Sequence, residues 1–197
     1  MFETTVIDDL VSIDIQRYLH DTIMKQADWK FLNDVSGADQ QTYPSHGFVH
    51  LMKHPDVQKP SHLYYPVTEK IIPALIANHI KFKTLYHARI FLQLPLAQQY
   101  NKEHNGIHVD LPKDLPHIAC VYYVNGSDGD TIIYEQTSDS VAGDSTGVQM
   151  VEHMRVRPKR GRAVLFDGSR YHCSSQPNIN YRCIINFDLL KVNDGIS

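Results

Sequence analysis

The second half of the chain consists of short stretches in which apolar residues alternate with other residues and turn sequences follow. Between positions 89 and 94, Ile90, Leu92 and Leu94 would share one face of a β-strand, as period-two alternation predicts. Turn pairs such as Asn125-Gly126 separate several of these stretches. Further strands are predicted at residues 118–124, 131–134, 150–156, 163–166 and 181–189. Six or more short strands joined by turns favour a β-sandwich or barrel.

Ahead of these strands the sequence predicts two helices. The first follows an extended run at residues 5–11 and begins after Ser12, which can cap it. Its predicted apolar face comprises Ile15, Tyr18, Leu19 and Ile23. A strand at residues 29–32 follows, and then a second helix from about residue 67 to residue 80.

In this second helix the predicted inward face is Ile71, Ile72, Leu75, Ile76 and Ile80. Pro73 is expected either to bend the helix or to mark its start. The two helices can cover one face of a sheet. We therefore expect an α+β protein, mainly β, with a β-rich core.

The composition narrows the class of protein. At 197 residues the chain suits one domain, and neither a linker nor an internal repeat divides it. Its net charge of −3 provides no general attraction to nucleic acid or anionic membranes. No run approaches the roughly 18 apolar residues of a membrane span, and the polar start is unlike a signal peptide. Three cysteines without CxxC spacing indicate reduced thiols, so we expect a cytoplasmic location.

A candidate metal site lies in the strand-rich half. His108 and Asp110 form an HxD triplet, and residues i and i+2 of a strand lie on one face. His172 can complete a set of two histidines and one carboxylate, and Arg182 follows ten residues later. Such a set is typical of non-heme Fe(II) oxygenases, because the opposite face of the metal stays open for cosubstrate and oxygen.

The arginine indicates which cosubstrate would fit. A 2-oxo acid can chelate Fe(II), and a distal carboxylate on that acid would match the planar fork of Arg182. Charge-assisted hydrogen bonds of this kind contribute about 1.5–3 kcal/mol. The three ligands and the arginine together therefore favour a dicarboxylic 2-oxo acid.

Other histidines are weaker ligand candidates. His104 and His108 are four residues apart, like a helical zinc pair, but a glycine interrupts that helix and the sequence contains no HExxH. His117 and His153 are rivals for the third ligand position. Neither is followed by an arginine-bearing strand at suitable spacing, and this favours His172.

Four segments then occur in an order and spacing that a known enzyme family shares. They are GIHVD at 106–110, CVYYVNGSDGDT at 120–131, VRPKRGRAVLFDGSRYH at 156–172 and YRCIINFDL at 181–189. Together they resemble the 2-oxoglutarate and Fe(II)-dependent dioxygenases, and within them the prolyl 4-hydroxylase-like group. In that family the first segment contains two metal ligands, and the second is a tyrosine-bearing strand followed by a Gly-(Glu/Asp)-Thr turn. The third segment ends at the third ligand, and the fourth contains an arginine. The similarity extends over residues 89–189.

The resemblance implies a double-stranded β-helix, a jelly-roll or cupin-like core, with supporting N-terminal helices. Residues 1–86 would form the helical and strand support, and residues 87–190 the catalytic β core of a single domain, 1–197. The HxD triplet is expected to begin the ligand set of that core.

The resemblance also implies the roles of five residues. His108, Asp110 and His172 would bind Fe(II), while Arg182 and Tyr123 would bind the distal carboxylate of 2-oxoglutarate. Molecular oxygen is then the second cosubstrate, and ascorbate is a further cofactor that this family admits.

Departures from the family pattern concern the substrate. Ile184 stands where many relatives carry serine, and the tyrosine that often precedes the HxD triplet has two candidate counterparts, Gln93 and Tyr100.

The polar stretch 136–147 is predicted to form part of a lid over the iron. The basic run between 155 and 162 is predicted to be a solvated face, and Cys173, beside the third ligand, a packing residue.

The expected activity is hydroxylation of an unactivated C–H bond, with 2-oxoglutarate converted to succinate and CO2. A prolyl residue or another peptide side chain is the first choice of substrate, and a free amino acid or small metabolite is an alternative. Asp110 favours hydroxylation, because related halogenases lack this carboxylate. We expect neither a nucleic acid nor a membrane as partner.

An alternative function belongs to a different class. The chain could be a non-enzymatic cupin-like module that binds a metal or a small ligand, and such a module would not depend on 2-oxoglutarate.

Overall fold

The computed structural model describes residues 1–35, 45–97, 103–141 and 148–192. Its elements are β1 (Thr5–Ile7), α1 (Ile13–Gln26), β2 (Lys30–Leu32), β3 (Gly47–Lys53), α2 (Tyr64–Ala77), β4 (Thr84–Gln93), β5 (His117–Tyr123), β6 (Thr131–Thr137), β7 (Glu152–Val156), β8 (Ala163–Asp167), β9 (Arg170–Ser174) and β10 (Arg182–Leu190). The paired strands are antiparallel. The prediction of a mainly β protein with two helices is therefore confirmed.

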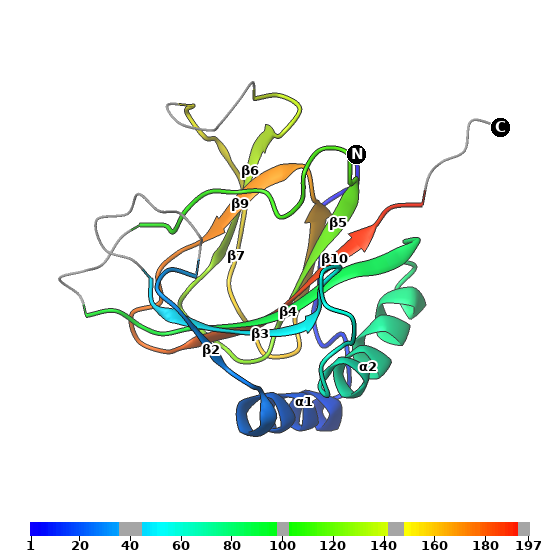
Figure 1. Cartoon of the computed structure of the whole chain (residues 1–197). Coiled ribbons are helices and arrows are strands. Elements are labelled where there is room, and N and C mark those ends of the chain that lie inside the picture. Colours follow the sequence, from blue (N-terminus) through cyan, green and yellow to red (C-terminus); the bar gives the residue numbers. More distant parts are fainter. Residues whose placement is uncertain (36–44, 98–102, 142–147, 193–197) are drawn as a thin grey trace.

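The strands form two sheets of unequal size. The large sheet has seven strands in the order β1-β8-β5-β10-β4-β3-β2, and the small sheet has three in the order β7-β6-β9. Both helices lie on one side of the large sheet, and the small sheet lies on the other side (Figure 1). Within the described residues, neither helix combines the length and apolar character that crossing a bilayer requires.

Strand β10 shows how alternation builds both layers. Ile185 and Phe187 are buried in the core cluster that includes Leu19 of α1. Ile184 is buried in a second cluster with Ile133 of the small sheet. Successive side chains of a strand point to opposite faces. The even-numbered residues of β10, which include a buried arginine and a buried asparagine, therefore face the small sheet.

The prediction of the first helix is confirmed for its cap and wrong for one residue of its inward face. The hydroxyl of Ser12 accepts a hydrogen bond from the backbone N–H of Ile15, as a helix cap does, but Tyr18 is 45% exposed. Gln16 is buried instead, because its amide donates to the backbone carbonyl of Val11 inside the protein.

The second helix begins three residues before the predicted start. Pro73 lies inside it rather than at its N-terminus. Ile76 is 59% exposed, whereas Ile71 and Leu75 are fully buried. Ile80 is also buried, beyond the end of the helix, and Ile72 is partly buried against the core, so Ile76 is the one member of the predicted inward face that does not reach it.

Two strands were not predicted, β3 and β9. Strand β3 pairs with β4 in the large sheet, and β9 pairs with β6 in the small sheet. Both contain polar residues that tertiary contacts bury: the ring of His50 in β3 bonds to the Ser61 hydroxyl at 2.8 Å, and β9 carries His172. Such strands lack the apolar alternation by which a strand is recognised in a sequence.

Candidate metal centre

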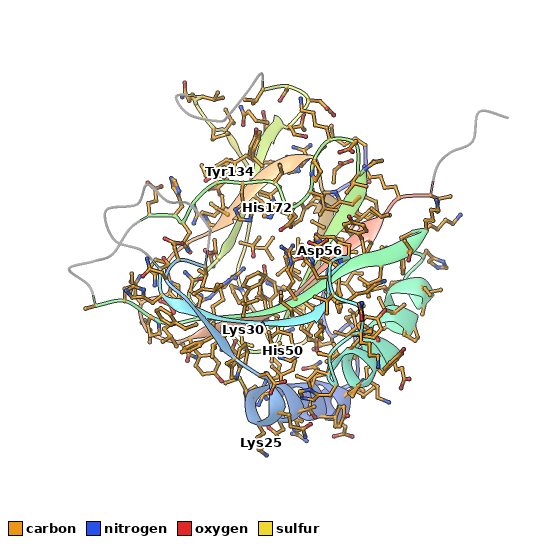
Figure 2. The ribbon with its side chains drawn as sticks, viewed as in Figure 1. Lys25, Lys30, His50, Asp56, Tyr134 and His172 are labelled. Carbon is orange, nitrogen blue, oxygen red and sulfur yellow. The ribbon has the colours of Figure 1, made fainter. Side chains whose placement is uncertain are left out.

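The two histidines and the aspartate predicted as metal ligands meet between the two sheets. One ligand atom from each of His108, Asp110 and His172 lies within 4.8 Å of the others. The distance from His172 Nε2 to Asp110 Oδ2 is 3.4 Å, and these two side chains are only 6% and 5% exposed. Figure 2 shows His172 between the large and the small sheet. No second group of this kind occurs in the described part of the chain.

Backbone pairing brings the HxD triplet to the third ligand. His108 and His172 exchange two backbone hydrogen bonds, of 3.0 and 2.9 Å, in an isolated antiparallel bridge. The HxD triplet is therefore not part of a continuous strand, contrary to the sequence prediction. The bridge places the two imidazoles next to each other, with ring centroids 4.6 Å apart and ring planes tilted by 54°.

Hydrogen bonds orient both imidazole rings. The Nδ1 atom of His108 is 2.9 Å from the Gly106 carbonyl oxygen, and the Nδ1 atom of His172 is 3.2 Å from the Arg170 carbonyl oxygen. Because a carbonyl only accepts, each Nδ1 carries the proton and donates. Each Nε2 atom is then left for a metal ion, which is the usual arrangement of metal-bound histidines.

The electrostatics of the site favour the ligand-competent protonation states of His108 and Asp110, whereas the shift in the pKa of His172 acts in the opposite direction. Burial, followed by the neighbouring His172, lowers the pKa of His108 to about 4. Burial alone would raise the pKa of Asp110, but the Arg89 guanidinium, together with His172 and His108, outweighs it and holds that pKa well below its usual range. Burial likewise acts to lower the pKa of His172, and the Asp110 carboxylate outweighs it and raises that pKa. A neutral imidazole and a carboxylate are the forms that bind Fe(II).

Arg182 and Tyr123 both contact Thr131; Arg182 and Thr131 line the cavity that contains the ligand triad, whereas Tyr123 is fully buried behind it and is not among the lining residues. The Nη2 atom of Arg182 donates to Thr131 Oγ1 at 2.8 Å, and the Tyr123 hydroxyl donates to the same oxygen at 2.7 Å. The Nε atom of Arg182 donates to the Gly129 carbonyl. Thr131 was not predicted as a site residue, although it closes the Gly-Asp-Thr turn that the sequence shows.

The Arg182 guanidinium is buried without a compensating carboxylate. Its residue is 6% exposed, and its hydrogen bonds run to a carbonyl and a hydroxyl. In the described part of the chain no ion pair involves it. Burial lowers the pKa of this guanidinium, because an uncompensated buried charge is costly. A bound carboxylate would compensate it.

A cavity of about 430 Å³ joins the ligand triad to Arg182 and Thr131. Its walls come from both sheets and from the segments after β2 and before the HxD triplet. Apolar wall residues include Leu32, Val35, Phe91, Val121 and Ile184. The cavity therefore offers a metal-binding end, a cationic end and an apolar wall.

Gln93 and Tyr100 were the two candidate counterparts of the tyrosine that precedes the HxD triplet in related proteins. Gln93 lines the cavity; its amide nitrogen donates to the Gln176 side chain at 3.1 Å, and its oxygen accepts from the Ser174 hydroxyl at 3.3 Å. Tyr100 lies outside the described residues. Of the predicted lid at 136–147, residues 136 and 137 belong to β6, and residues 142–147 also lie outside the described residues.

The rival ligands lie elsewhere. His153 is exposed on β7, and His117 begins β5; neither joins the triad. Cys173 is buried and its sulfur is 3.4 Å from the Tyr134 hydroxyl. The predicted basic face is paired with acidic side chains: Arg155 with Glu152 and Asp130, Lys159 with Asp8 and Asp9, and Arg162 with Asp8.

Sequence reasoning missed two residues that contact the Asp110 carboxylate. Arg89 Nη2 donates to Asp110 Oδ1 at 2.8 Å, and Asn186 Nδ2 donates to Asp110 Oδ2 at 3.2 Å. The sequence gives only weak evidence for these two residues. Each is a polar residue in a strand with alternating apolar residues, and it lies on the face opposite the apolar one.

Comparison with solved structures identifies proteins of the same fold. An oxidoreductase of the 2OG-Fe(II) oxygenase family from Burkholderia pseudomallei aligns with a TM-score of 0.66 and 11% identity, over 96% of this chain and 86% of its own. A prolyl-4-hydroxylase from Pseudomonas putida aligns with a TM-score of 0.60 and 12% identity, over 96% and 93%. A non-heme alpha-ketoglutarate-dependent epimerase from nogalamycin biosynthesis aligns with a TM-score of 0.64 and 10% identity, over 95% and 76%.

At these identities the similarity shows the fold, and the predicted resemblance is confirmed at that level. No protein-family model matches the sequence, and no curated protein is significantly similar to it. What the site does must therefore be argued from its own residues.

Proposed function

We propose that this protein is a 2-oxoglutarate and Fe(II)-dependent dioxygenase that hydroxylates an unactivated C–H bond. One observation carries the proposal: a buried guanidinium without a carboxylate partner shares a cavity with two histidines and an aspartate whose ligand atoms converge. A cupin-like metal-binding module has no need of the buried cation. A dicarboxylic 2-oxo acid would use both ends of the cavity at once.

The side chains present fit these groups. His108, Asp110 and His172 would hold Fe(II) through two imidazole nitrogens and a carboxylate oxygen, a donor set that suits this ion. When bound, Fe(II) and 2-oxoglutarate supply oxygen activation, in which 2-oxoglutarate becomes succinate and CO2. Arg182 would orient the cosubstrate through its distal carboxylate, and Thr131 would hold the guanidinium in place for that contact.

We also infer that the two facing sheets are the two sides of a double-stranded β-helix, in which residues 87–190 form the catalytic core. In support, the three metal ligands, Arg182 and Thr131 belong to this part of the chain, and the structural neighbours include 2-oxoglutarate oxygenases. Residues before it contribute β1, β2 and β3 to the large sheet and both helices behind it. Ascorbate as a cofactor stays a prediction from the sequence resemblance.

For the substrate we propose a prolyl residue or another side chain of a peptide. The sequence resemblance to the prolyl 4-hydroxylase-like group supports this choice, as does the similarity in fold to a prolyl-4-hydroxylase. A small metabolite is the second candidate, because the fold is shared with an epimerase from nogalamycin biosynthesis.

The test is a screen of proline-containing peptides with Fe(II), 2-oxoglutarate and oxygen. Succinate would be measured by NMR, and the peptide by mass spectrometry for the gain of one oxygen atom. We expect equimolar succinate and hydroxylated peptide from one class of peptide, and neither product with His172→Ala. If 2-oxoglutarate is neither bound in calorimetry nor consumed in any mixture, the cupin-like binding module becomes the better account.

A further inference from the structure

The two carboxylate oxygens of Asp110 have different surroundings. Oδ2 is 3.4 Å from His172 Nε2, so it lies on the side where the ligand atoms converge, and it accepts from Asn186 at 3.2 Å. Oδ1 accepts a shorter hydrogen bond, 2.8 Å, from Nη2 of Arg89. This second oxygen is therefore engaged by the protein before any metal binds.

Arg89 is itself held in place. The same Nη2 atom donates to Asp188 Oδ2 at 2.8 Å, and Asp188 is fully buried. The nitrogen of a third side chain, His87 Nδ1, is 3.0 Å from that Asp188 oxygen. The Arg89 guanidinium carbon also lies 5.7 Å from the centre of the Phe91 ring.

The sheet register brings these groups together. Arg89 in β4 is paired with Asn186 in β10, and His87 is paired with Asp188. The two residues that contact the Asp110 carboxylate are thus direct partners in one antiparallel ladder. Strands β4 and β10 pair along their whole length, whereas the segment that carries the HxD triplet is attached to β9 by the His108–His172 bridge and by the hydrogen bond from the Asn105 N–H to the Ser174 carbonyl.

We propose that Arg89, fixed by Asp188, is a positioning residue that presents Asp110 to the metal through one oxygen only. The inference rests on the metal centre of the proposed function. With Oδ1 bound to the arginine at 2.8 Å, the oxygen presented to the metal is Oδ2, which faces His172 and accepts only the longer hydrogen bond from Asn186. Coordination through a single oxygen occupies one position on the metal, and this keeps the further positions free that a chelating cosubstrate and oxygen require.

A purely structural role for Arg89 makes a different prediction. Two buried carboxylates, Asp110 and Asp188, flank one guanidinium, so removal of the guanidinium would lower the stability of the fold in either case. If charge compensation were its only role, variants that still fold would bind metal as the wild-type protein does. Metal affinity and coordination in the folded protein therefore separate the two roles.

The experiment compares Arg89→Gln, Arg89→Lys and Asp188→Asn with the wild-type protein. Arg155→Gln is the matched control, since Arg155 also pairs with two carboxylates but lies on the exposed β7. Each protein would be titrated with Co(II) in calorimetry without oxygen, and the Co(II) absorption bands would be recorded before and after 2-oxoglutarate is added. Circular dichroism would confirm that each variant is folded.

We expect Arg89→Gln to bind Co(II) about 10- to 100-fold more weakly, as loss of a ligand-orienting partner typically does, with altered absorption bands. Arg89→Lys should recover part of the affinity but not the wild-type bands, because the lysine side chain is one bond shorter and its nitrogen cannot take the position of Nη2 between both carboxylates. Asp188→Asn should fall between the wild-type protein and Arg89→Gln, and Arg155→Gln should match the wild-type protein.

The inference would be overturned if the folded Arg89→Lys and Asp188→Asn variants bound Co(II) with wild-type affinity and showed wild-type absorption bands. These two variants decide the question even if Arg89→Gln does not fold. If the wild-type protein itself binds no Co(II), the proposed function fails, and this inference fails with it.

Discussion

At the scale of single residues, Thr131 determines how the cationic end of the cavity is presented. Its oxygen accepts hydrogen bonds from Tyr123 and Arg182, at 2.7 and 2.8 Å. A hydroxyl has two acceptor positions and one donor, so both acceptor positions are used and the O–H proton remains available. Thr131 lines the cavity, and we expect this proton to be donated to a bound carboxylate.

Arg182→Lys should weaken 2-oxoglutarate binding while leaving metal binding unchanged. The lysine keeps the charge but loses the planar pair of donors. Loss of a charge-assisted hydrogen bond costs about 1.5–3 kcal/mol, or about 10- to 100-fold in the dissociation constant. Calorimetry with 2-oxoglutarate, in the presence of Co(II), measures this change. Wild-type affinity in the variant would remove Arg182 from its assigned role.

Thr131→Val and Tyr123→Phe separate two models of the same site. If Tyr123 acts only through Thr131, Tyr123→Phe should reduce affinity for 2-oxoglutarate less than Thr131→Val does. Thr131→Val should cost about tenfold, equivalent to one hydrogen bond to a charged group. If the tyrosine binds the carboxylate directly, as the sequence resemblance implies, the two variants should be equally impaired in the same titration.

The chemistry of these residues could be predicted from their types, but their partners could not. Few side chains bind Fe(II) or a carboxylate. The sequence therefore indicates a site for both through the spacing of two histidines, an aspartate and an arginine. Arg89 and Asn186 are common residue types in strands. Their importance arises only from the register that brings β4 and β10 together, and a single sequence does not contain that register.

At the scale of elements, the strands were predictable where one face is apolar and the other is not. Strand β10 alternates in this way, and its predicted range of 181–189 agrees closely with the observed Arg182–Leu190. Strands β3 and β9 could not be recognised, because they bury the polar side chains of His50 and His172. A buried polar strand depends on partners that are distant in the sequence.

The turn between β7 and β8 offers a test at this scale. Gly161 has a φ of +81°, and a Cβ atom there would overlap the amide of Gln16 on α1. Gly161→Ala should lower the free energy of unfolding by about 1–3 kcal/mol, the usual cost of this backbone conformation in other residues. Urea denaturation measures the difference.

Gly126→Ala is the matched control for this variant. The nearest neighbour of a Cβ atom at Gly126 is the Pro158 carbonyl oxygen, 3.9 Å away. We expect its unfolding free energy to remain close to the wild-type value. Equal stability of the two alanine variants would show that the turn between β7 and β8 does not need glycine.

At the scale of the whole molecule, one carboxylate connects the two ends of the described chain. Asp167 at the end of β8 accepts from the backbone N–H of Phe2 and from the Lys191 ammonium, both at 2.7 Å. Burial alone would raise the pKa of Asp167, but the hydrogen bonds from Lys191, Phe2 and Ser169 outweigh it and lower the pKa to about 2.

This shift predicts how stability depends on pH. The lowered pKa means that Asp167 stabilises the folded state fully above its ordinary pKa of 3.8 and loses this contribution as the pH falls toward 2. Asp167→Asn should therefore be about 1.5–3 kcal/mol less stable at pH 7, as expected for hydrogen bonds to a charged group. The difference should shrink as the pH falls below 4, in thermal unfolding followed by circular dichroism. A difference that is constant with pH would exclude the charge as its cause.

The central claim is that one cavity holds both Fe(II) and 2-oxoglutarate, and a visible spectrum tests it most directly. Fe(II) and 2-oxoglutarate would be added to the purified protein without oxygen, separately and together. We predict a weak charge-transfer band that requires both additions and is lost in Asp110→Ala and in His172→Ala. A protein that shows no band, and no affinity for 2-oxoglutarate in calorimetry, would contradict the claim.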